Sequence, residues 1–296
     1  MNSEDHTIKY VVISPVRDEE LNIEKTILSM VSQSIKPVEW IIVDDGSTDN
    51  TGSIIDAYAA QYHWIKALHR NDRGFRQAGG GVIDAFYDGY NRLRSKEWAY
   101  IVKLDGDLKF DGDYFENCFK YFDEDQNLGI SGGGIYHLLH DKMILEENPV
   151  FHVRGATKIY RQACWNDIGG LFRVPGWDTL DEIKANLCGW KTKGFVEMKL
   201  LHLRYTGEAE GSWRNLVKNG LANYIAGYHP LFMFFKCMKR SVQKPYGIQA
   251  IGLMYGFMKG YFKKIPQVDD RELVCYLRKE QINSLLLRPS IWTKNK

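Results

Sequence analysis

Residues 9–49 read KYVVISPVRDEELNIEKTILSMVSQSIKPVEWIIVDDGSTD, and this stretch decides the fold. A β-rich run over 9–14 is followed, after Pro15, by a helical pattern in which apolar residues recur every three to four positions. The short apolar run 40–43 then ends at the turn-rich DDGSTD. Strand, helix and strand in this order predict two parallel strands joined by a crossover helix.

The same alternation continues along the first half of the chain. Further strands are expected at 64–68 and 99–104, with a helix between them at about 82–93. The loops after the four strands read SPVRDEE, DDGSTD, HRNDRGFRQAGGG and DGDLKFDGD. Because ligands of open α/β sheets bind beyond the carboxyl ends of the strands, these acidic, basic and glycine-rich loops predict a site for a charged, metal-bridged ligand.

The second half has a less regular pattern. We expect a strand at 150–160, a helix at about 179–187, and mostly helical structure from residue 212 onward. A soft boundary at Leu231 divides the chain into a domain of residues 1–230 and a helical C-terminal region of residues 231–296.

Composition excludes several classes of protein. The 296 residues are 44% hydrophobic and 26% charged, which is ordinary for globular proteins and excludes collagen-like, disordered and coiled-coil chains. Five scattered cysteines without a C-x-x-C motif indicate neither a disulfide framework nor a structural zinc site. Residues 1–7 are polar and acidic and lack the features of a secretion signal, so we expect a cytoplasmic protein.

The C-terminal region differs in charge from the rest of the chain. Residues 231–296 hold 13 Lys and Arg against 4 Asp and Glu, a net charge of +9, whereas residues 1–230 hold 26 against 33, a net charge of −7. Segments such as LFMFFKCMKR and YGFMKGYFKK mix basic with apolar residues, which indicates peripheral contact with an anionic membrane and not with nucleic acid. The alternative is solvated lysines on ordinary core helices. No apolar run is long enough to span a bilayer.

Two acidic motifs directly follow predicted strands. DDGSTD begins at Asp44 and DGD spans Asp105 to Asp107. Carboxylates separated by one residue in a tight turn suit Mg²⁺ or Mn²⁺, which prefer oxygen ligands and accept phosphates and water in the rest of their shell. The alternative for DDGS is an Asx-turn that caps the next helix, and both roles are compatible.

The stretch VVISPVRDEELNIEKTILSMVSQSIKPVEWIIVDDGSTDNT resembles the opening of family 2 glycosyltransferases, which are inverting enzymes of the GT-A fold, and DGD stands where their metal-binding DxD motif stands. The resemblance covers residue 11 to about residue 207. It implies an α/β nucleotide-diphospho-sugar transferase fold, with a mixed, mostly parallel central sheet flanked by helices and followed by a C-terminal helical region.

The resemblance also assigns roles to residues of the donor site. It places the base and ribose of a sugar nucleotide against Pro15, Val16, Asp18 or Glu19, and Asp45. It implies that Asp105 contacts the ribose, the sugar or the metal, and that Asp107 is a metal ligand. The first loop departs from the family pattern, in which an Asn often occurs where this chain has VRDEE.

Basic side chains are candidates for the diphosphate. Arg70, Arg73 and Arg76 precede three glycines that open a helix, and Arg76 ranks first because it is nearest to them. His202 is a candidate to complete the metal shell, and Arg204 is a candidate phosphate partner. Surface arginines and a structural histidine are the alternatives.

The base that deprotonates the acceptor is expected in residues 169–192, GGLFRVPGWDTLDEIKANLCGWKT, which resembles the family's acidic motif and following helix. The resemblance aligns Asp178 with the catalytic aspartate, although the usual preceding Glu is Trp177 here. Asp181 and Glu182 therefore compete for the role. Asp178 also reads as a helix N-cap with Asp181 at N3, a purely structural role.

Together these features predict a cytoplasmic, metal-dependent, inverting glycosyltransferase of the hexosyltransferase kind. With Mn²⁺ or Mg²⁺ it would move a sugar from a nucleotide donor, expected to be UDP-linked, to a hydroxyl of a glycan or lipid-linked acceptor in polysaccharide biosynthesis. The alternative is a catalytically degenerate binding or scaffold subunit. A nucleotidyltransferase is disfavoured because the first loop lacks the expected Gly-rich, basic sequence.

Overall fold

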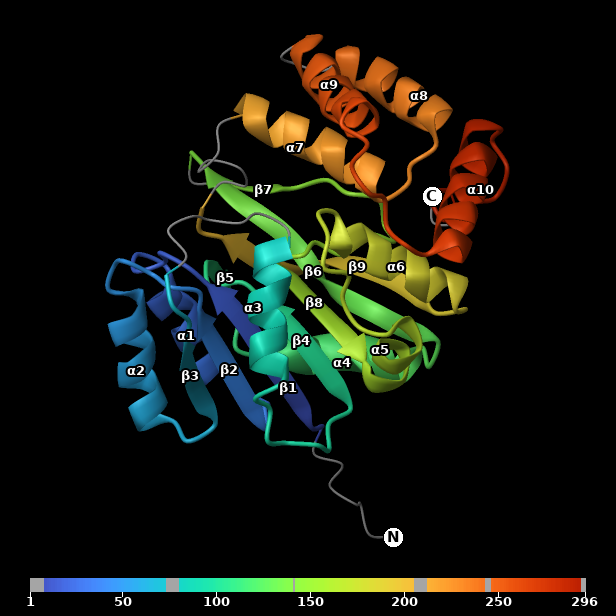
Figure 1. The fold of residues 1–296 in the computed structure, drawn as a ribbon. Helices are drawn as coiled ribbons and strands as arrows, with labels where there is room; N and C mark the ends of the chain where they lie inside the picture. Colours follow the sequence, from blue (N-terminus) through green and yellow to red (C-terminus); the bar gives the residue numbers. More distant parts are fainter. Residues whose placement is uncertain (1–7, 73–79, 141, 205–211, 243–245, 294–296) are drawn as a thin grey trace, which may run out of the picture.

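A computed structural model describes residues 8–72, 80–140, 142–204, 212–242 and 246–293 (Figure 1). The strands are β1 (Tyr10–Val16), β2 (Glu39–Asp44), β3 (Ile65–His69), β4 (Tyr100–Leu104), β5 (Leu108–Phe110), β6 (Leu128–Leu139), β7 (Lys142–Leu145), β8 (Thr157–Arg161) and β9 (Lys191–His202). The helices are α1 (Ile23–Val31), α2 (Thr51–Gln61), α3 (Gly80–Tyr90), α4 (Tyr114–Glu124), α5 (Gln162–Ile168), α6 (Trp177–Leu187), α7 (Ser212–Ile225), α8 (Pro230–Ser241), α9 (Ile248–Phe262) and α10 (Arg271–Leu285).

One mixed sheet forms the centre of the described chain. Its order is β3-β2-β1-β4-β8-β6-β9-β5, with β7 paired to β6. Strands β1 to β4 pair in parallel, as the alternating sequence predicted, while β8 runs antiparallel to both β4 and β6. The α/β class with a mixed sheet is confirmed, and antiparallel pairs are concentrated in the half that the sequence pattern left irregular.

Both faces of the sheet are covered by helices because its strands are apolar on both sides. In β1, Tyr10 and Val12 join the core under α1 and α4, while Val11 and Ile13 join the core under α3 and α5. This alternation follows from the two-residue period of a strand. The strands are therefore fixed from both sides, and the loops at their carboxyl ends are held at one edge.

A third core joins the C-terminal helices to α6. It contains Leu180 and Ile183 of α6 together with buried side chains from α7, α8, α9 and α10. Helix α7, which precedes the expected boundary at Leu231, packs along α9. At their crossing, a Cβ at Gly256 would collide with the backbone oxygen of Val217, so the two helices approach with backbone against backbone.

These C-terminal helices lie at one end of the molecule. Figure 1 shows α7, α8 and α9 at the end opposite the N-terminus, beyond the carboxyl end of β1. Among the described helices, none combines the length and hydropathy needed to cross a bilayer.

Candidate active site

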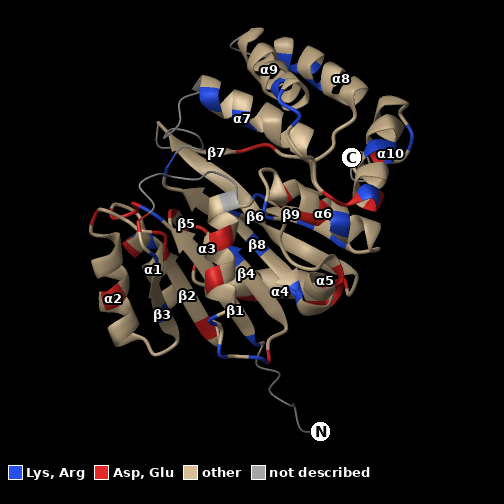
Figure 2. Cartoon of the chain, viewed as in Figure 1, with Lys and Arg blue, Asp and Glu red and all other residues tan. Residues whose placement is uncertain are grey.

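The acidic loops converge at the carboxyl edge of the sheet. The loop after β1 is tied to the loop after β2, since Asp18 accepts a hydrogen bond from the Thr48 amide at 2.9 Å and the Ser47 hydroxyl accepts one from the Asp18 amide at 2.9 Å. Asp18 adopts a left-handed conformation, with φ of 52°, to make this connection. Figure 2 shows acidic residues in the loops where these strands end.

The residues expected to line the base and ribose lie on these two loops. Pro15 and Val16 are buried at the end of β1, in register with Val43 and Asp44 of β2. The amide of Asp45 donates to the Val16 carbonyl at 2.8 Å, so Asp45 lies directly beside this strand end.

The Asx-turn expected in DDGS is made by Asp44, whose Oδ1 accepts the Ser47 amide at 2.9 Å. That leaves the Asp45 carboxylate for another partner, Arg70, at 2.5 Å. Arg70 also contacts Asp88 at 2.8 Å, and it therefore organises the loops after β2 and β3. Arg76 lies outside the described residues.

Asp107 sits in a basic and largely buried position. Its Oδ2 lies 3.2 Å from His202 Nε2 and 3.5 Å from Arg204 Nη2, and Arg204 also forms an ion pair with Glu19. Burial would raise the pKa of Asp107, but His202 and Arg204 outweigh it and hold the pKa below its usual value. The contacts join the loop after β1, the DGD motif and the end of β9 into one site.

The oxygen atoms of Asp107 show whether a cation fits this position. Its Oδ1 is buried and has no hydrogen-bond partner within the part of the chain that the structure describes, which is the state expected of an oxygen that awaits a cation. His202 beside it provides a nitrogen that such metals accept. The described residues contain no group of three or more side chains placed to hold a metal ion.

Asp105, the first acid of DGD, has a different partner. It pairs with the Nζ of Lys103, a side chain only 3% exposed, and this Nζ also donates to the Gly155 carbonyl at 2.6 Å. Burial raises the pKa of Asp105, and Lys103 only partly opposes this effect. Lys103 therefore fixes Asp105 against the segment that precedes β8.

That same segment brings Asp178 close to the DGD motif. A Cβ on Gly155 would lie 3.2 Å from Asp178 Oδ2 and 3.0 Å from the Trp177 ring, and Lys103 Nζ lies 5.5 Å from the centre of that ring. Asp178 is half-buried in the first turn of α6. Asp178 therefore lies next to Gly155, and Asp105 is linked to the same residue through Lys103.

The charge around Asp178 favours its ionised form. Burial acts to raise its pKa, but His152, Lys158, Arg154 and Lys103 together hold the pKa below the usual value. A carboxylate that remains ionised can accept a proton at any pH above this low value.

The two competing acids are buried inside the fold. Asp181 lies 2.8 Å from Lys158 Nζ and 2.5 Å from the Tyr160 hydroxyl, while Glu182 lies 2.8 Å from both Lys158 Nζ and His152 Nδ1. The side chains of Asp181, Glu182 and Lys158 are all 0% exposed. Burial raises the pKa of Asp181 to about 6, against the opposing effect of Lys158. These carboxylates hold α6 onto β8.

Lys103 and Lys158 were missed by the sequence analysis, although each leaves a signal. Lys103 is a single lysine in the otherwise apolar strand YIVKL, and Lys158 lies beside the apolar Ile159 and Tyr160 in the strand TKIYR. A buried ammonium requires a carboxylate partner, so a lysine in such a run predicts an ion pair inside the fold. Lys103 pairs with Asp105, two positions along the chain, whereas the partners of Lys158, Asp181 and Glu182, lie far away in the sequence and cannot be read from it.

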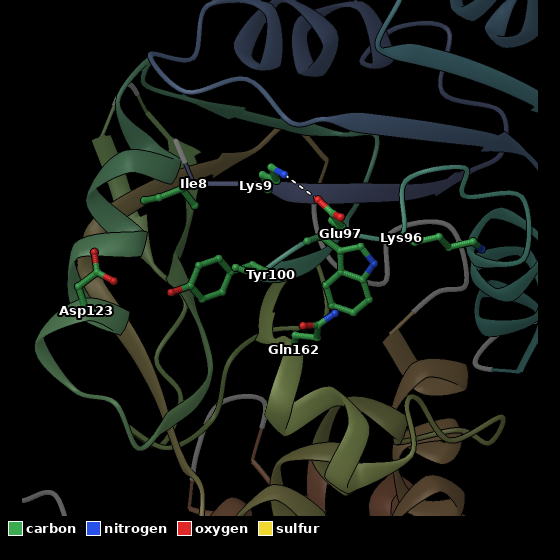
Figure 3. Close-up of a pocket in the computed structure, with 9 residues that line it drawn as sticks. Ile8, Lys9, Lys96, Glu97, Tyr100, Asp123 and Gln162 are labelled. Atoms are coloured by element: carbon green, nitrogen blue, oxygen red, sulfur yellow. Dashed lines mark hydrogen bonds and ion pairs between the residues drawn. The ribbon is translucent and has the colours of Figure 1, made fainter. Parts of the chain in front are cut away.

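A hollow lies at the opposite edge of the sheet. Its volume is about 590 Å³, and its lining includes Lys9, Glu97, Tyr100 and Gln162 at the start of β1 and β4 (Figure 3). Lys9 and Glu97 form an exposed ion pair across it at 2.9 Å. Because it faces away from the acidic loops, it is separate from the site described above.

The profile of glycosyl transferase family 2 matches residues 11–142, which contain both acidic motifs. This part of the chain, a little under half of its length, is similar to glycosyl transferase family 2. Among its relatives is the uncharacterized glycosyltransferase EpsJ of Bacillus subtilis, 30% identical over 131 residues, which are 44% of this chain and 35% of EpsJ. The minor teichoic acid biosynthesis protein GgaB of the same organism is 31% identical over 43% of this chain and 13% of its own length. The chain thus spans about a third or less of these relatives.

Solved structures of glycosyltransferases share the fold over most of the chain. The mannosyltransferase PcManGT from Pyrobaculum calidifontis, in complex with GDP-Man and Mn²⁺, superposes with a TM-score of 0.60 at 14% identity and covers 86% of this chain and 87% of its own. S. aureus TarS 1–349 in complex with UDP-GlcNAc gives a TM-score of 0.54 at 17% identity, with 94% and 81% covered. The GT-A fold expected from the sequence is confirmed.

Proposed function

We propose that the protein is a metal-dependent, inverting glycosyltransferase that moves a sugar from a nucleotide donor to a hydroxyl of a glycan or lipid-linked acceptor in the synthesis of a polysaccharide or a teichoic acid-like polymer. The observation that carries this proposal is the contact network in which Glu19, Arg204, Asp107 and His202 join the loops of the family 2 segment to the end of β9. The relatives EpsJ and GgaB support the assignment by their names.

The donor half of the site consists of the loops after β1, β2 and β4. Pro15, Val16 and Asp45 would line the base and ribose, with Asp18 and Glu19 positioned by their contacts to the next loop. PcManGT holds GDP-Man and TarS holds UDP-GlcNAc, which supports a sugar nucleotide as ligand here. We expect UDP as the nucleotide.

Asp107 and His202 would hold the cation, Mn²⁺ or Mg²⁺, with Asp105 at the sugar or on the metal. When bound, this ion would offset the negative charge that develops on the departing diphosphate. Arg204 is placed to exchange its contacts with Glu19 and Asp107 for contacts with donor phosphate. The chain's own part is to bring these charges to one position before the donor arrives.

Asp178 would be the general base. It is half-buried, held ionised by surrounding positive charge, and lies beside Gly155, whose carbonyl binds the Lys103 that pairs with Asp105. Asp181 and Glu182 are less suited, because their side chains are 0% exposed and their oxygens already bind Lys158. In an inverting transfer the acceptor oxygen bonds to the anomeric carbon, the bond to the diphosphate breaks, and the base receives the hydroxyl proton.

The test compares two variants in one assay. Asp107→Asn should abolish Mn²⁺-dependent UDP binding measured by calorimetry, while Asp178→Asn should bind UDP normally and transfer or hydrolyse a UDP-sugar roughly 10²–10⁴-fold more slowly. Asp269→Asn, which changes an exposed acid near α10, is the matched control.

Full turnover by Asp178→Asn would show that Asp178 is not the general base. A wild-type protein that releases no nucleotide from any of a panel of sugar nucleotides with Mn²⁺ or Mg²⁺ would instead identify a binding or scaffold subunit.

A further inference from the structure

Helix α8 carries an exposed apolar stripe along its length. The stripe consists of Leu231, Phe234, Phe235, Met238 and Val242, which recur at helical spacing on the helix and its C-cap. Their exposed fractions lie between 45% and 72%. Met233 and Cys237 on the opposite side are buried in the third core, so α8 packs on the rest of the chain through that side and not through the stripe.

Helix α9 repeats the arrangement. Its exposed stripe contains Ile248, Ile251, Tyr255, Met258 and Phe262, again spaced three to four residues apart, with exposed fractions from 38% to 80%. The inward side of α9 contributes Leu253 and Phe257 to the same third core. Each helix therefore has two apolar faces, and only one of them is covered within the described chain.

The two helices pack on each other, so the stripes belong to one end of the molecule. Soluble monomers rarely expose contiguous apolar patches beyond a few hundred Å², and larger ones mark a docking surface. We therefore expect a partner to cover the two stripes.

The positive charge of residues 212–268 favours an anionic partner for the two stripes. Residues 212–268 contain nine Lys and Arg and no Asp or Glu. Figure 2 shows these basic positions on α7, α8 and α9 without any acidic one. Lys239, Lys263 and Lys264 are exposed at the ends of the stripes. A second copy of this chain would bring like charges together, whereas anionic lipid headgroups would offset them and the acyl region would cover the apolar side chains.

We propose that α8 and α9 dock side-on to a bilayer that contains anionic lipid, with their apolar stripes in the acyl boundary and the lysines at the headgroups. The helices are 12 and 15 residues long. At about 1.5 Å per residue they are shorter than the roughly 30 Å hydrocarbon core, so they lie in the interface and do not cross it.

Figure 1 shows α8 and α9 at the end of the molecule away from the start of β1, on the side of its carboxyl end. A docked molecule would hold its acidic loops on the membrane side. If the proposed transferase function holds, this orientation favours an acceptor carried on a lipid, and this last step alone rests on that function.

The experiment is flotation of the full chain with vesicles of phosphatidylcholine containing about one third phosphatidylglycerol, with pure phosphatidylcholine vesicles beside them. Wild type should float with the anionic vesicles at low salt and be released by high salt. The apolar variant Phe234→Asn/Ile251→Asn should bind at least about tenfold more weakly. The charge variant Lys263→Gln/Lys264→Gln should bind roughly 30-fold more weakly.

The control variant Val196→Asn/Leu287→Asn removes two apolar side chains of similar exposure, 50% and 90%, outside α8 and α9 and should float like wild type. Absence of wild type from the anionic lipid fraction, or full binding by the apolar variant, would overturn the proposal. So would dimers in light scattering that the apolar variant abolishes, since a second copy would then cover the surface.

Hydrolysis of a soluble sugar nucleotide, measured on the same samples, separates the two proposals. Flotation without hydrolysis would leave membrane docking intact and remove the transferase function. Hydrolysis without flotation would do the reverse. Thermal unfolding of each variant, compared with that of wild type, shows whether it is folded whatever its activity.

Discussion

Replacement of Lys158 by Met tests the buried ion cluster between α6 and β8. The Lys158 Nζ lies 2.8 and 3.0 Å from the two oxygens of Asp181 and 2.8 Å from Glu182, and all three side chains are fully buried. Met fills a similar volume but leaves two carboxylates without their shared cation. Removal of one partner of a buried ion pair typically costs about 3–5 kcal/mol, and we expect a loss in this range near pH 8.

The loss should shrink in acid. With Lys158 present, burial already raises the pKa of Asp181 to about 6, and without the ammonium it must rise further. A carboxyl whose folded pKa lies above its unfolded value of about 4 favours the folded state at low pH and loses that contribution as the pH rises through the folded pKa. Between about pH 8 and pH 5.5 the variant should therefore recover about 1–3 kcal/mol.

The assay is urea unfolding at both pH values, with stability taken from the midpoint and slope. Lys191→Met is the matched control, because Lys191 pairs with Asp125 at 2.7 Å on the surface, where the two side chains are 62% and 35% exposed. Such a pair contributes about 0–1 kcal/mol. A Lys158→Met loss below about 1 kcal/mol, or an equal loss at both pH values, would refute the reasoning.

Three further predictions follow from contacts of single side chains. Because surrounding positive charge holds the pKa of Asp178 below its usual value, the transfer rate should stay flat down to about pH 5, and a rate that falls with an apparent pKa near 6 would point to Asp181 instead. His152→Gln should lower the free energy of unfolding by about 1–3 kcal/mol near pH 6 and by less near pH 9, measured by urea unfolding. Burial lowers the pKa of His152, but Glu182 outweighs it and raises the pKa, so the pair adds stability that is lost as the pH rises. An equal loss at both pH values would contradict an ion pair between His152 and Glu182. Gly256→Ala should lower stability by about 1–3 kcal/mol, because a Cβ there meets backbone of α7, and unchanged thermal unfolding would exclude this contact.

The parallel half of the fold was predictable from the sequence because its strands are short apolar runs separated by clear turns. The strands expected at 9–14 and 40–43 are confirmed as β1 and β2, which extend two residues and one residue further toward the acidic loops. The strand expected at 150–160 was mostly wrong, since only β8 at Thr157–Arg161 is extended.

The glycine-rich GISGGG was not predicted as a strand, because glycine has low strand propensity. It lies in β6, where a Cβ at Gly133 would collide with the backbone oxygen of Met198 in β9. This requirement comes from a residue 65 positions away in the printed sequence. The local sequence pattern therefore does not show that these glycines lie in a strand.

The candidate site, like the fold, was predictable from the sequence only in part. The loops after the strands could be placed at one edge of the sheet because parallel strands all end there; Asp45 follows β2 and Asp107 follows β4, with β1 between these two strands. Which acids are accessible could not be predicted, because it depends on Lys158 reaching Asp181 and Glu182 but not the carboxylate of Asp178. The catalytic and ligand roles of these residues stay predictions.

The residue between the two acids of DGD has a consequence for how this protein can evolve. A Cβ at Gly106 would lie 2.5 Å from Val16 Cγ1 and 3.2 Å from Ile23 Cδ1, so the chain has no room for a side chain there. Homologues that carry a larger spacer between these acids should have a smaller residue at the position of Val16, and substitutions at the two positions should have become fixed as pairs. An ancestral lineage that changed one position alone would have had to reshape the turn that carries Asp107.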